Sequence, residues 1–451
     1  MIKLNIYQII NIIINDIINN NMNDFVKDII SNGGNVYLVG GAVRNIFYNK
    51  IHNENKPIKD RDILVEKMKN EQLKTILAKY GNIKEAGQMF GVIKFKIFGT
   101  HEEIDVALPR KEVSTGSGYK DFKVTIDPET IFVGDDLSRR DATINAMVVQ
   151  IYSTQDMYKK DYDEKNLIDL FDGINDIKNL VWRAVGNADI RFLEDPTRMM
   201  RAIRQCAELN LKLEEKTQKS IINNYKLLDI IIKQAPVRIT EEIVRTLQAI
   251  NCYPQIEFIF NSKIGEYIDL KYSDTILTAL KYANDMKMQL HIKVAILLMN
   301  SNISEWIKKY ELSASPHFEK QYVNFIICVD KLYYDLLKCN NEIKFRNLMQ
   351  EIDKLCPNKC HEFTLNLIEY HEAIQLSTNK ILREYLDKNK NRPLNTSEIL
   401  LDGNMIQTKF KMKGRQIGEL KKWLLKEITK DRVVNKTEEL INHVSFFYLN
   451  K

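Results

Sequence analysis

The chain contains 451 residues, with 66 Lys and Arg against 60 Asp and Glu, which gives a formal net charge of +6. At about 150 residues per domain, this length predicts about three domains, or one compact domain followed by a long helical extension. Hydrophobic residues make up 44% and charged residues 28% of the chain, which excludes collagen-like, disulfide-scaffold and wholly disordered proteins.

The N-terminal segment is rich in Ile and Asn, as residues 9–16 show. Asn and Asp interrupt each apolar run well before the ~20 residues that a membrane span requires. No pattern of a secretory signal is visible, and the first arginine is Arg44, which argues against a transit peptide. We therefore expect a cytoplasmic protein without a membrane partner. The small excess of basic residues permits a nucleic-acid partner without requiring one.

The six cysteines show no C-x-x-C spacing, and the chain has only seven histidines. We therefore expect free thiols in a reducing compartment rather than a zinc site. The cysteines are Cys206, Cys252, Cys328, Cys339, Cys356 and Cys360.

The hydrophobic pattern changes along the chain. Short β-rich runs, such as 35–39 and 91–98, alternate with turns in residues 1–185. Beyond Glu194, apolar residues recur three and four apart, as in residues 199–204, which predicts helices. The pattern thus indicates an α/β head and an all-helical remainder. We place the boundary at 155–165, where residues 159–165 are polar, and a weaker break at 385–396.

A Gly-Gly turn follows the first predicted strand. Gly40 and Gly41 come directly after the apolar run 36–39 and before a predicted helix. Two glycines let the backbone approach a ligand, and the free N–H groups of a helix start bind phosphate. Arg44, one turn later, could reach the same phosphate. Most Gly-Gly turns only close a strand–helix corner, so this motif alone leaves both interpretations open.

Two carboxylates precede the next predicted strand. Asp60 and Asp62 come before the apolar run 63–65, and the two-residue period of a strand places both on one face. Carboxylates about 6–7 Å apart repel each other unless cations lie between them. Mg²⁺ binds a few carboxylates together with substrate phosphates. An isolated Asp-x-Asp is more often a solvated turn, but its position after the Gly-Gly turn favours a metal site.

A third acid on a nearby strand would complete a two-metal site. Asp105 lies in the alternating run 103–108 and has the required phase. A carboxylate at a sheet edge explains its spacing equally well.

Two arginines are followed by polar groups in the run 135–147. Arg139 and Arg140 supply phosphate ligands, and Asp141 and Asn145 can bond ribose hydroxyls. The apolar character of residues 143–147 argues against a surface turn.

The fourth motif opens the first predicted long helix. Pro196 suits the first helical turn. Charged residues recur at steps of three and form one stripe, opposite apolar Met and Ile side chains: Asp195, Arg198, Arg201 and Arg204. Periodicity does not decide whether this stripe faces solvent or a cleft.

In this order, the four motifs resemble those of the class II tRNA nucleotidyltransferases (CCA-adding enzymes) and bacterial poly(A) polymerases of the polymerase β superfamily. The resemblance is dense over residues 36–207 and looser over 237–242 and 401–418. Residues 110–119 resemble the flexible head loop of that family, and 167–176 resemble the motif that leads into its neck.

The resemblance implies an α+β fold. A polymerase-β-like nucleotidyltransferase head, with a small mixed β-sheet and helices, precedes an all-helical neck, body and tail. The implied ranges are 1–160 for the head, 161–265 for the neck with base recognition, 266–390 for the body and 391–451 for a tRNA-binding tail. Basic clusters at 409–415 and 421–423 are candidate tRNA contacts, although such clusters are usually solvated.

The resemblance also implies residue roles. Asp60 and Asp62 would bind Mg²⁺, with Asp105 as a third catalytic carboxylate. The triphosphate or ribose would be bound by Gly40, Gly41, Arg44, Arg140, Asp141 and Asn145. Asp195 and Arg198 would read the base edge, because an acceptor beside a two-donor guanidinium complements cytosine or adenine. Arg201 and Arg204 would support that reading or bind phosphate.

The implied function is template-independent addition or repair of the 3′-terminal CCA of tRNA from CTP and ATP, with release of pyrophosphate. Alternatives are a poly(A) polymerase, a half-enzyme that adds only CC or only A, and a non-catalytic RNA-binding relative. The complete head loop around 116–122 favours addition of both C and A. The oligomeric state stays open.

Two departures from the family pattern stand out. Asn45 occupies the place where the family usually has Asp, so we expect reduced efficiency without loss of activity. Residues 290–295 lack the His-Asp pair of a phosphohydrolase domain, so we expect no metal-dependent phosphatase activity.

Overall fold

The computed structural model describes residues 23–58, 62–86, 91–101, 103–114, 122–151, 166–357 and 359–448. They form two compact units, which meet in the chain between Tyr267 and Ile268. Four segments discussed above lie outside the described residues: the N-terminal run 9–16, Asp60, the core of the head loop at 116–119 and the polar connection 159–165. In the part that is described, no helix is both long and apolar enough to cross a membrane.

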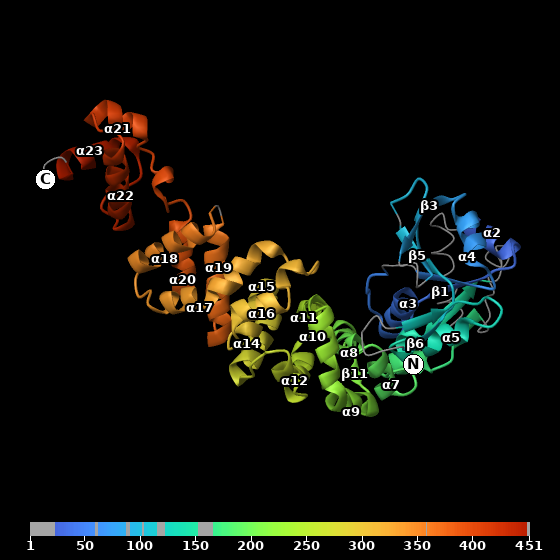
Figure 1. The fold of residues 1–451 in the computed structure, drawn as a ribbon. Coiled ribbons are helices and arrows are strands. Elements are labelled where there is room, and N and C mark those ends of the chain that lie inside the picture. Colours follow the sequence, from blue (N-terminus) through green and yellow to red (C-terminus); the bar gives the residue numbers. More distant parts are fainter. Residues whose placement is uncertain are drawn as a thin grey trace. The chain divides into compact units, whose positions relative to one another are not determined.

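A seven-stranded sheet forms the centre of the first unit (Figure 1). Its strand order is β3-β4-β5-β2-β1-β8-β9; β2 and β5 are parallel, and all other neighbours are antiparallel. This mixed sheet confirms the predicted α+β head. The strands are β1 (Asn35–Val39), β2 (Asp62–Glu66), β3 (Gly81–Ala86), β4 (Val92–Ile97), β5 (Glu103–Ala107), β8 (Met147–Ile151) and β9 (Leu167–Asp169). A separate antiparallel hairpin joins β6 (Lys111–Ser114) and β7 (Phe122–Thr125).

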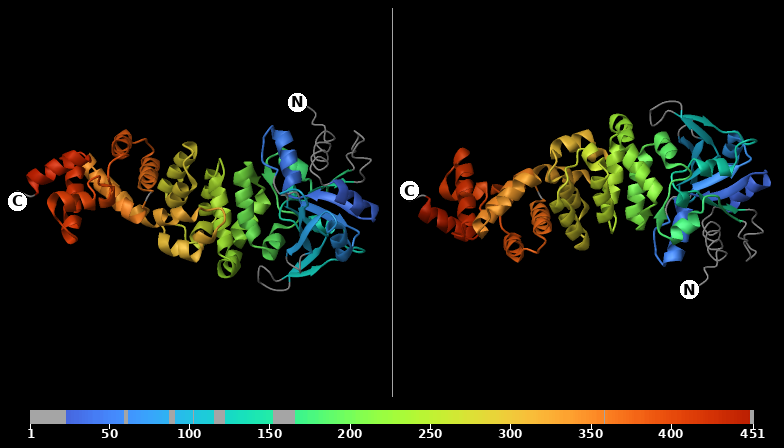
Figure 2. Two further views of the ribbon diagram at one scale, coloured as in Figure 1. Left: turned by 90° about the horizontal axis from the view of Figure 1, so that it is seen from above. Right: turned by 90° about the horizontal axis from the view of Figure 1, so that it is seen from below.

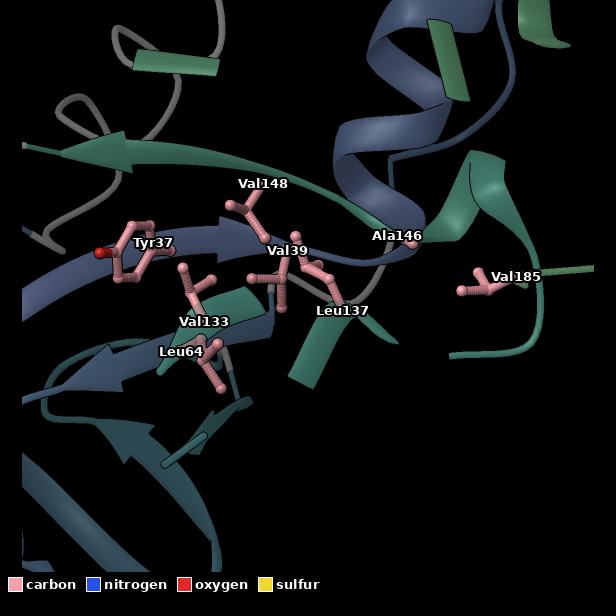
Figure 3. Packing of buried hydrophobic residues seen from close by; sticks show 8 residues of the cluster. All are labelled: Tyr37, Val39, Leu64, Val133, Leu137, Ala146, Val148 and Val185. Carbon is pink, nitrogen blue, oxygen red and sulfur yellow. The ribbon is translucent and has the colours of Figure 1, made fainter. Parts of the chain in front are cut away.

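Alternation along β1 builds the core of the head. Tyr37 and Val39 lie two residues apart and therefore point to the same face of the sheet. They pack with Leu64, Val148 and the apolar side of α5, as Figure 3 shows. This packing places the end of α5, which Arg139 and Arg140 follow, near the end of β1. The helices of the head are α2 (Asn23–Ser31), α3 (Gly41–His52), α4 (Asn70–Leu77), α5 (Val133–Ser138), the short 3₁₀ helix η1 (Thr143–Asn145) and α6 (Gly173–Lys178).

The helix predicted at residues 199–204 is confirmed as part of α8 (Thr197–Leu209). The carboxylate of Asp195 accepts a bond from the Thr197 N–H at the helix start, and Asn210 ends the helix in the left-handed conformation. The apolar side chains Met199 and Ile203 are fully buried. The helix packs against α11 (Val237–Gln248) among the green neck helices of Figure 2.

The remaining elements of the first unit are short. A two-stranded parallel sheet joins β10 (Val181–Trp182) and β11 (Lys212–Leu213). The helices are α7 (Ala188–Glu194), α9 (Glu215–Asn224), η3 (Tyr225–Leu227), α10 (Leu228–Gln234), α12 (Tyr253–Asn261) and α13 (Ile264–Tyr267).

The second unit consists of helices throughout its described residues. It has its own apolar cores, one of them built from Leu401, Leu420, Leu424 and Leu440 near the C-terminus. The division of the whole chain into four parts stays a prediction. The helices are α14 (Asp274–Asp285), α15 (Leu290–Leu298), α16 (Ile303–Lys309), η4 (Leu312–Ala314), η5 (Lys320–Tyr322), α17 (Val323–Leu337), α18 (Glu342–Leu355), α19 (Cys360–Gln375), α20 (Lys380–Asn389), η6 (Thr396–Glu398), α21 (Gly403–Phe410), α22 (Arg415–Thr429) and α23 (Thr437–Phe447).

Candidate active site

The Gly-Gly turn joins β1 to α3. Gly40 has a φ of 75°, which side-chain-bearing residues rarely adopt. A Cβ atom there would lie 3.0 Å from Asp62 Oδ2 and 3.6 Å from Arg140 Nη1. Three sequence motifs that are far apart in the chain therefore meet at this turn.

Strand register places two of the predicted carboxylates on neighbouring strands. Ile63 of β2 is paired with Val106 of β5 in the parallel ladder. Asp62 and Asp105 each come one residue before this pair, so they lie on the same face of the sheet. Asp105 Oδ1 is 3.5 Å from Lys94 Nζ, and its side chain is 42% exposed.

These carboxylates fit a divalent cation in donor chemistry. The missing side chain of Gly40 leaves space against the Asp62 carboxylate, where a Cβ atom would intrude. Carboxylate oxygens completed by substrate phosphates are the donor set that Mg²⁺ prefers. Within the described residues, no group of three or more His, Cys, Asp and Glu is placed to hold a metal ion. Asp60, which would be the second ligand, lies outside those residues.

Arg44 is held on two edges. Its Nη1 donates to Asn145 Oδ1 at 2.7 Å, and its Nε donates to Asn45 Oδ1 at 3.0 Å. The Asn45 amide nitrogen donates in turn to the carbonyl oxygen of Pro57 at 2.8 Å. Burial lowers the pKa of Arg44 to about 10, so the guanidinium stays charged at neutral pH.

Arg139 and Arg140 share a buried carboxylate at α5. Asp136 accepts from Arg139 Nε at 3.1 Å and from Arg140 Nη2 at 3.1 Å. Burial alone would raise the pKa of Asp136, but the two guanidinium groups outweigh it and lower that pKa. Arg139 also donates to Glu112 of β6, at 3.0 Å. Two carboxylates, Asp136 and Glu112, thus hold the two arginines at the end of α5.

Asp141 is buried beneath the charged stripe of α8. Its Oδ2 accepts from Arg201 Nη2 at 2.8 Å, and its Oδ1 accepts from Asn145 Nδ2 at 2.8 Å. Burial would raise the pKa of Asp141, but Arg201 and Asn145 outweigh it and hold that pKa well below its usual range. Asp141 is thus a charged structural link between head and neck, and not a proton donor at neutral pH.

The predicted base-reading pair lies at the start of α8. Asp195 Oδ1 accepts from Thr197 N–H at 3.0 Å, and no described residue bonds its Oδ2. Arg198 is buried and donates to Glu194 at 2.8 Å and to the Arg139 carbonyl oxygen at 2.9 Å. The second of these bonds connects the neck to the arginine motif of the head.

Arg204 is committed to acidic partners in the neck. It forms ion pairs with Glu242 of α11 and with Glu208, which is also 3.0 Å from Arg245 Nη2. Its side chain is only 6% exposed. The geometry favours a support role for Arg204, because its Nε and Nη1 already donate to Glu242 and Glu208.

One cleft of about 1130 Å³ contains most of the predicted site. Nine arginines and seven carboxylates line it. Because a planar guanidinium can donate two hydrogen bonds to one phosphate group, the cleft suits a polyanion. The charged stripe of α8 therefore faces a cleft. Helical periodicity alone did not distinguish a cleft from solvent. Of the predicted residues, the lining includes Gly40, Gly41, Arg44, Asp62, Arg140, Asp141, Asn145, Asp195, Arg198, Arg201 and Arg204. Asp105 lies outside this lining.

Several lining residues were not among the predicted site residues. Glu112 sits on a short strand, and Gln205, Glu208, Glu242 and Arg245 lie on helices whose charges resemble any solvated face. The packing of α8 against α11 brings the four helical residues to the cleft.

Comparisons with known proteins agree with this geometry. Residues 36–183 match the family described as the Poly A polymerase head domain. The CCA-adding enzyme of Lactobacillus delbrueckii subsp. bulgaricus is 36% identical over 217 residues, which are 47% of this chain and 46% of that enzyme. The chain thus aligns with about half the length of this relative. The CCA-adding enzyme of Ligilactobacillus salivarius is 28% identical over 423 residues, 91% of this chain and 92% of that enzyme.

Solved structures show the same fold. The Bacillus stearothermophilus CCA-adding enzyme in complex with CTP has a TM-score of 0.68 at 19% identity and covers 94% of this chain and 95% of its own. The Thermotoga maritima CCA-adding enzyme complexed with tRNA has a TM-score of 0.62 at 20% identity and covers 92% of both chains.

Proposed function

From the match of residues 36–183 to the Poly A polymerase head domain and the likeness to CCA-adding enzymes, we propose that this chain is a class II tRNA nucleotidyltransferase that adds or repairs the 3′-terminal CCA of tRNA from CTP and ATP. The observation that carries the proposal is the single cleft that joins the Gly40 turn, Asp62 and the Asp195–Arg198 pair. A phosphate-binding turn, a metal-binding acid and a base-reading pair are the parts that template-independent nucleotide addition requires. The proposed location is the cytoplasm.

The proposed reaction is an in-line displacement. The 3′-hydroxyl oxygen of the tRNA bonds to the α-phosphorus of the nucleotide, and the bond to the β-phosphate oxygen breaks, so pyrophosphate leaves. Arg44 and Arg140 border the Gly40 turn and would hold the polyphosphate and its growing charge. Mg²⁺, held by Asp60 and Asp62, would lower the pKa of the attacking hydroxyl and neutralise the leaving group.

Base choice is proposed to depend on the start of α8. The Oδ2 atom of Asp195 would accept from the exocyclic amine of cytosine or adenine, and Arg198 would donate to a ring acceptor. The bond from Arg198 to the Arg139 carbonyl oxygen supports this proposal, because it links the start of α8 to the arginines that follow α5.

Extension of three tRNA transcripts, ending before CCA, after C and after CC, tests the proposal. With CTP, ATP and Mg²⁺, we expect all three to stop cleanly at CCA. A long A ladder would indicate a poly(A) polymerase, and arrest at CC, or addition of A alone, would indicate a half-enzyme. Asp62→Ala is the matched control: it should abolish extension and leave tRNA binding nearly intact. An inactive native protein that still binds tRNA would favour the non-catalytic alternative.

A further inference from the structure

A buried chain of hydrogen bonds runs from β10 to the Gly-Gly turn. Trp182 Nε1 donates to Gln205 Oε1 at 3.0 Å, and Asn145 Nδ2 donates to the same oxygen at 3.0 Å. Trp182 is fully buried and Gln205 is 2% exposed. Two donors therefore converge on one carboxamide oxygen in a site where unpaired polar groups are costly.

Gln205 helps to decide which way the Asn145 carboxamide faces. The oxygen and nitrogen ends of a carboxamide are similar in size, so packing alone does not distinguish them. Asn145 Nδ2 donates to Gln205 and to Asp141 Oδ1, which use its two hydrogens. The Asn145 oxygen is thereby turned toward Arg44, whose Nη1 donates to it at 2.7 Å.

The orientation of Asn145 in turn fixes the Arg44 guanidinium. Nη1 is bound by Asn145 and Nε by Asn45, so two edges of the planar group are held. The third nitrogen, Nη2, lies against the turn, 3.4 Å from the position that a Cβ atom of Gly41 would occupy. The bonds to Nη1 and Nε thus fix the direction of Nη2, the donor that faces the phosphate-binding turn.

We propose that Gln205 is a positioning residue for the nucleotide triphosphate, which it serves through Asn145 and Arg44, and that Trp182 holds Gln205 in place. The inference rests on the proposed function, because it assigns the aimed guanidinium to the triphosphate. Gln205 itself is not a catalytic residue. A purely structural glutamine would contribute to folding and have no specific connection to Arg44.

A double-mutant cycle on CTP binding separates these two roles. Gln205→Met, Arg44→Ala and the double variant of the full chain are titrated with CTP and Mg²⁺ by calorimetry. We expect Gln205→Met to raise the Kd for CTP about tenfold, as removal of one bond to a charged group does. In the Arg44→Ala background, the same change should have less than about a twofold effect.

The outcomes distinguish the inference from the proposed function. Equal weakening by Gln205→Met in both backgrounds, or no weakening in either, would overturn the inference alone. Absence of CTP binding by the native protein would overturn the proposed function and the inference with it. Gln205→Glu keeps an acceptor oxygen and should restore the native Kd to within about threefold.

Two further variants control for folding. Ser262→Ala removes a buried hydrogen bond to the Ile259 carbonyl oxygen elsewhere in the first unit and should leave the Kd for CTP unchanged. If Gln205→Met does not fold, Gln205→Asn enters the same cycle, because the shorter side chain withdraws the oxygen from Asn145 and keeps the site polar. The same criteria then apply: a weakening that is independent of Arg44 overturns the inference.

Discussion

Gly40 and Gly173 lack a side chain for different local reasons. At Gly40 the backbone has a positive φ and the Asp62 carboxylate lies against the turn. At Gly173 a Cβ atom would lie 2.4 Å from the Thr143 carbonyl oxygen, so no side chain fits between α6 and η1. Gly40 lines the cleft. Gly173 lets α6 pack closely against η1, which follows the arginine motif.

Gly40→Ala should abolish most nucleotide addition. The Cβ atom would displace the Asp62 carboxylate by a fraction of an ångström or more, and misplacement of this order lowers turnover about 100-fold. Steady-state incorporation of CTP measures the effect. Gly33→Ala is the matched control, because Gly33 also has a positive φ but no atom lies within 4 Å of its missing side chain. Equal losses in both variants would assign the effect to backbone strain alone.

The bond from Asn45 to Pro57 reverses the expectation drawn from the family pattern: Asn45→Asp should lower the efficiency of nucleotide addition, although it restores the acid that the family usually has. The Asn45 nitrogen donates to the Pro57 carbonyl oxygen, and a carboxylate oxygen would repel that carbonyl. We expect kcat/KM for CTP to fall about three- to tenfold, since one neutral hydrogen bond is lost.

The comparison variant for Asn45 lies one turn further along α3. Asn49 holds both backbone groups of Lys56, with bonds of 2.7 and 2.8 Å. Asn49→Asp loses the same kind of bond without a contact to Arg44, so it should impair CTP use less than Asn45→Asp does. A gain of activity in Asn45→Asp would show instead that the missing charge limits catalysis.

At the scale of elements, a buried arginine joins helices of the second unit. Arg346 of α18 is fully buried and donates to Asn389 Oδ1 at 2.6 Å and to the carbonyl oxygen of Ile428 at 2.9 Å. It also pairs with Asp431, just after the end of α22. A cation at the carbonyl end of a helix is favoured by the helix dipole. One side chain thereby connects α18, α20 and α22.

Arg346→Met should destabilise the second unit by about 3 kcal/mol, because it leaves buried carbonyl and carboxylate groups without their donor. Hydrogen exchange of α22 in the full chain measures the loss locally. Arg392→Met removes the more exposed partner of Asp431 and should cost less than about 1 kcal/mol. Comparable protection of α22 in native protein and Arg346→Met would contradict this role.

At the scale of the whole molecule, the proposed tRNA contacts include basic residues of the second unit. The loop between α21 and α22, with its flanks, exposes a set of lysines that we call the tail patch: Lys409, Lys411, Lys413 and Lys422. Lysines that are exposed in this way add phosphate contacts at little structural cost.

Neutralisation of the tail patch by four Lys→Gln changes should weaken tRNA binding and leave the KM for CTP unchanged. Each lost phosphate contact should make the negative slope of log K against log salt less steep by about 0.7–0.9. Filter binding at several salt concentrations measures this slope. The control replaces four exposed lysines elsewhere in the second unit: Lys331, Lys338, Lys344 and Lys354. Equal slopes for the two quadruple variants would exclude a specific role for the tail patch.

Most elements of the head were predictable because their signals are local. The apolar runs at 36–39 and 63–65 became β1 and β2, and the run at 91–98 became β4. The helix at α8 followed from its three- and four-residue spacing. The packing of the second unit was not predictable in detail, because apolar periodicity identifies a buried helix face but not its neighbour.

The candidate site was likewise predictable only where its signals are local in the sequence. Motif order identified the residues that line the cleft, and this identification needed no coordinates. It did not show that Arg204 pairs with Glu242, because this partner lies 38 residues away on another helix. It did not single out Gln205 either, because a glutamine on a mostly apolar helix face is unremarkable by periodicity.

The sequence by itself determined the α+β head, the helical remainder and most of the predicted site residues that the fold brings to one cleft. These follow from short-range rules: side-chain alternation, helical spacing and the freedom of glycine at a turn. The tertiary structure alone decided which charged side chains form ion pairs with one another and which face the cleft. Those ion pairs join segments that are far apart in the chain. The segments come close together only when α8 packs against α11 and the Gly40 turn lies against Asp62.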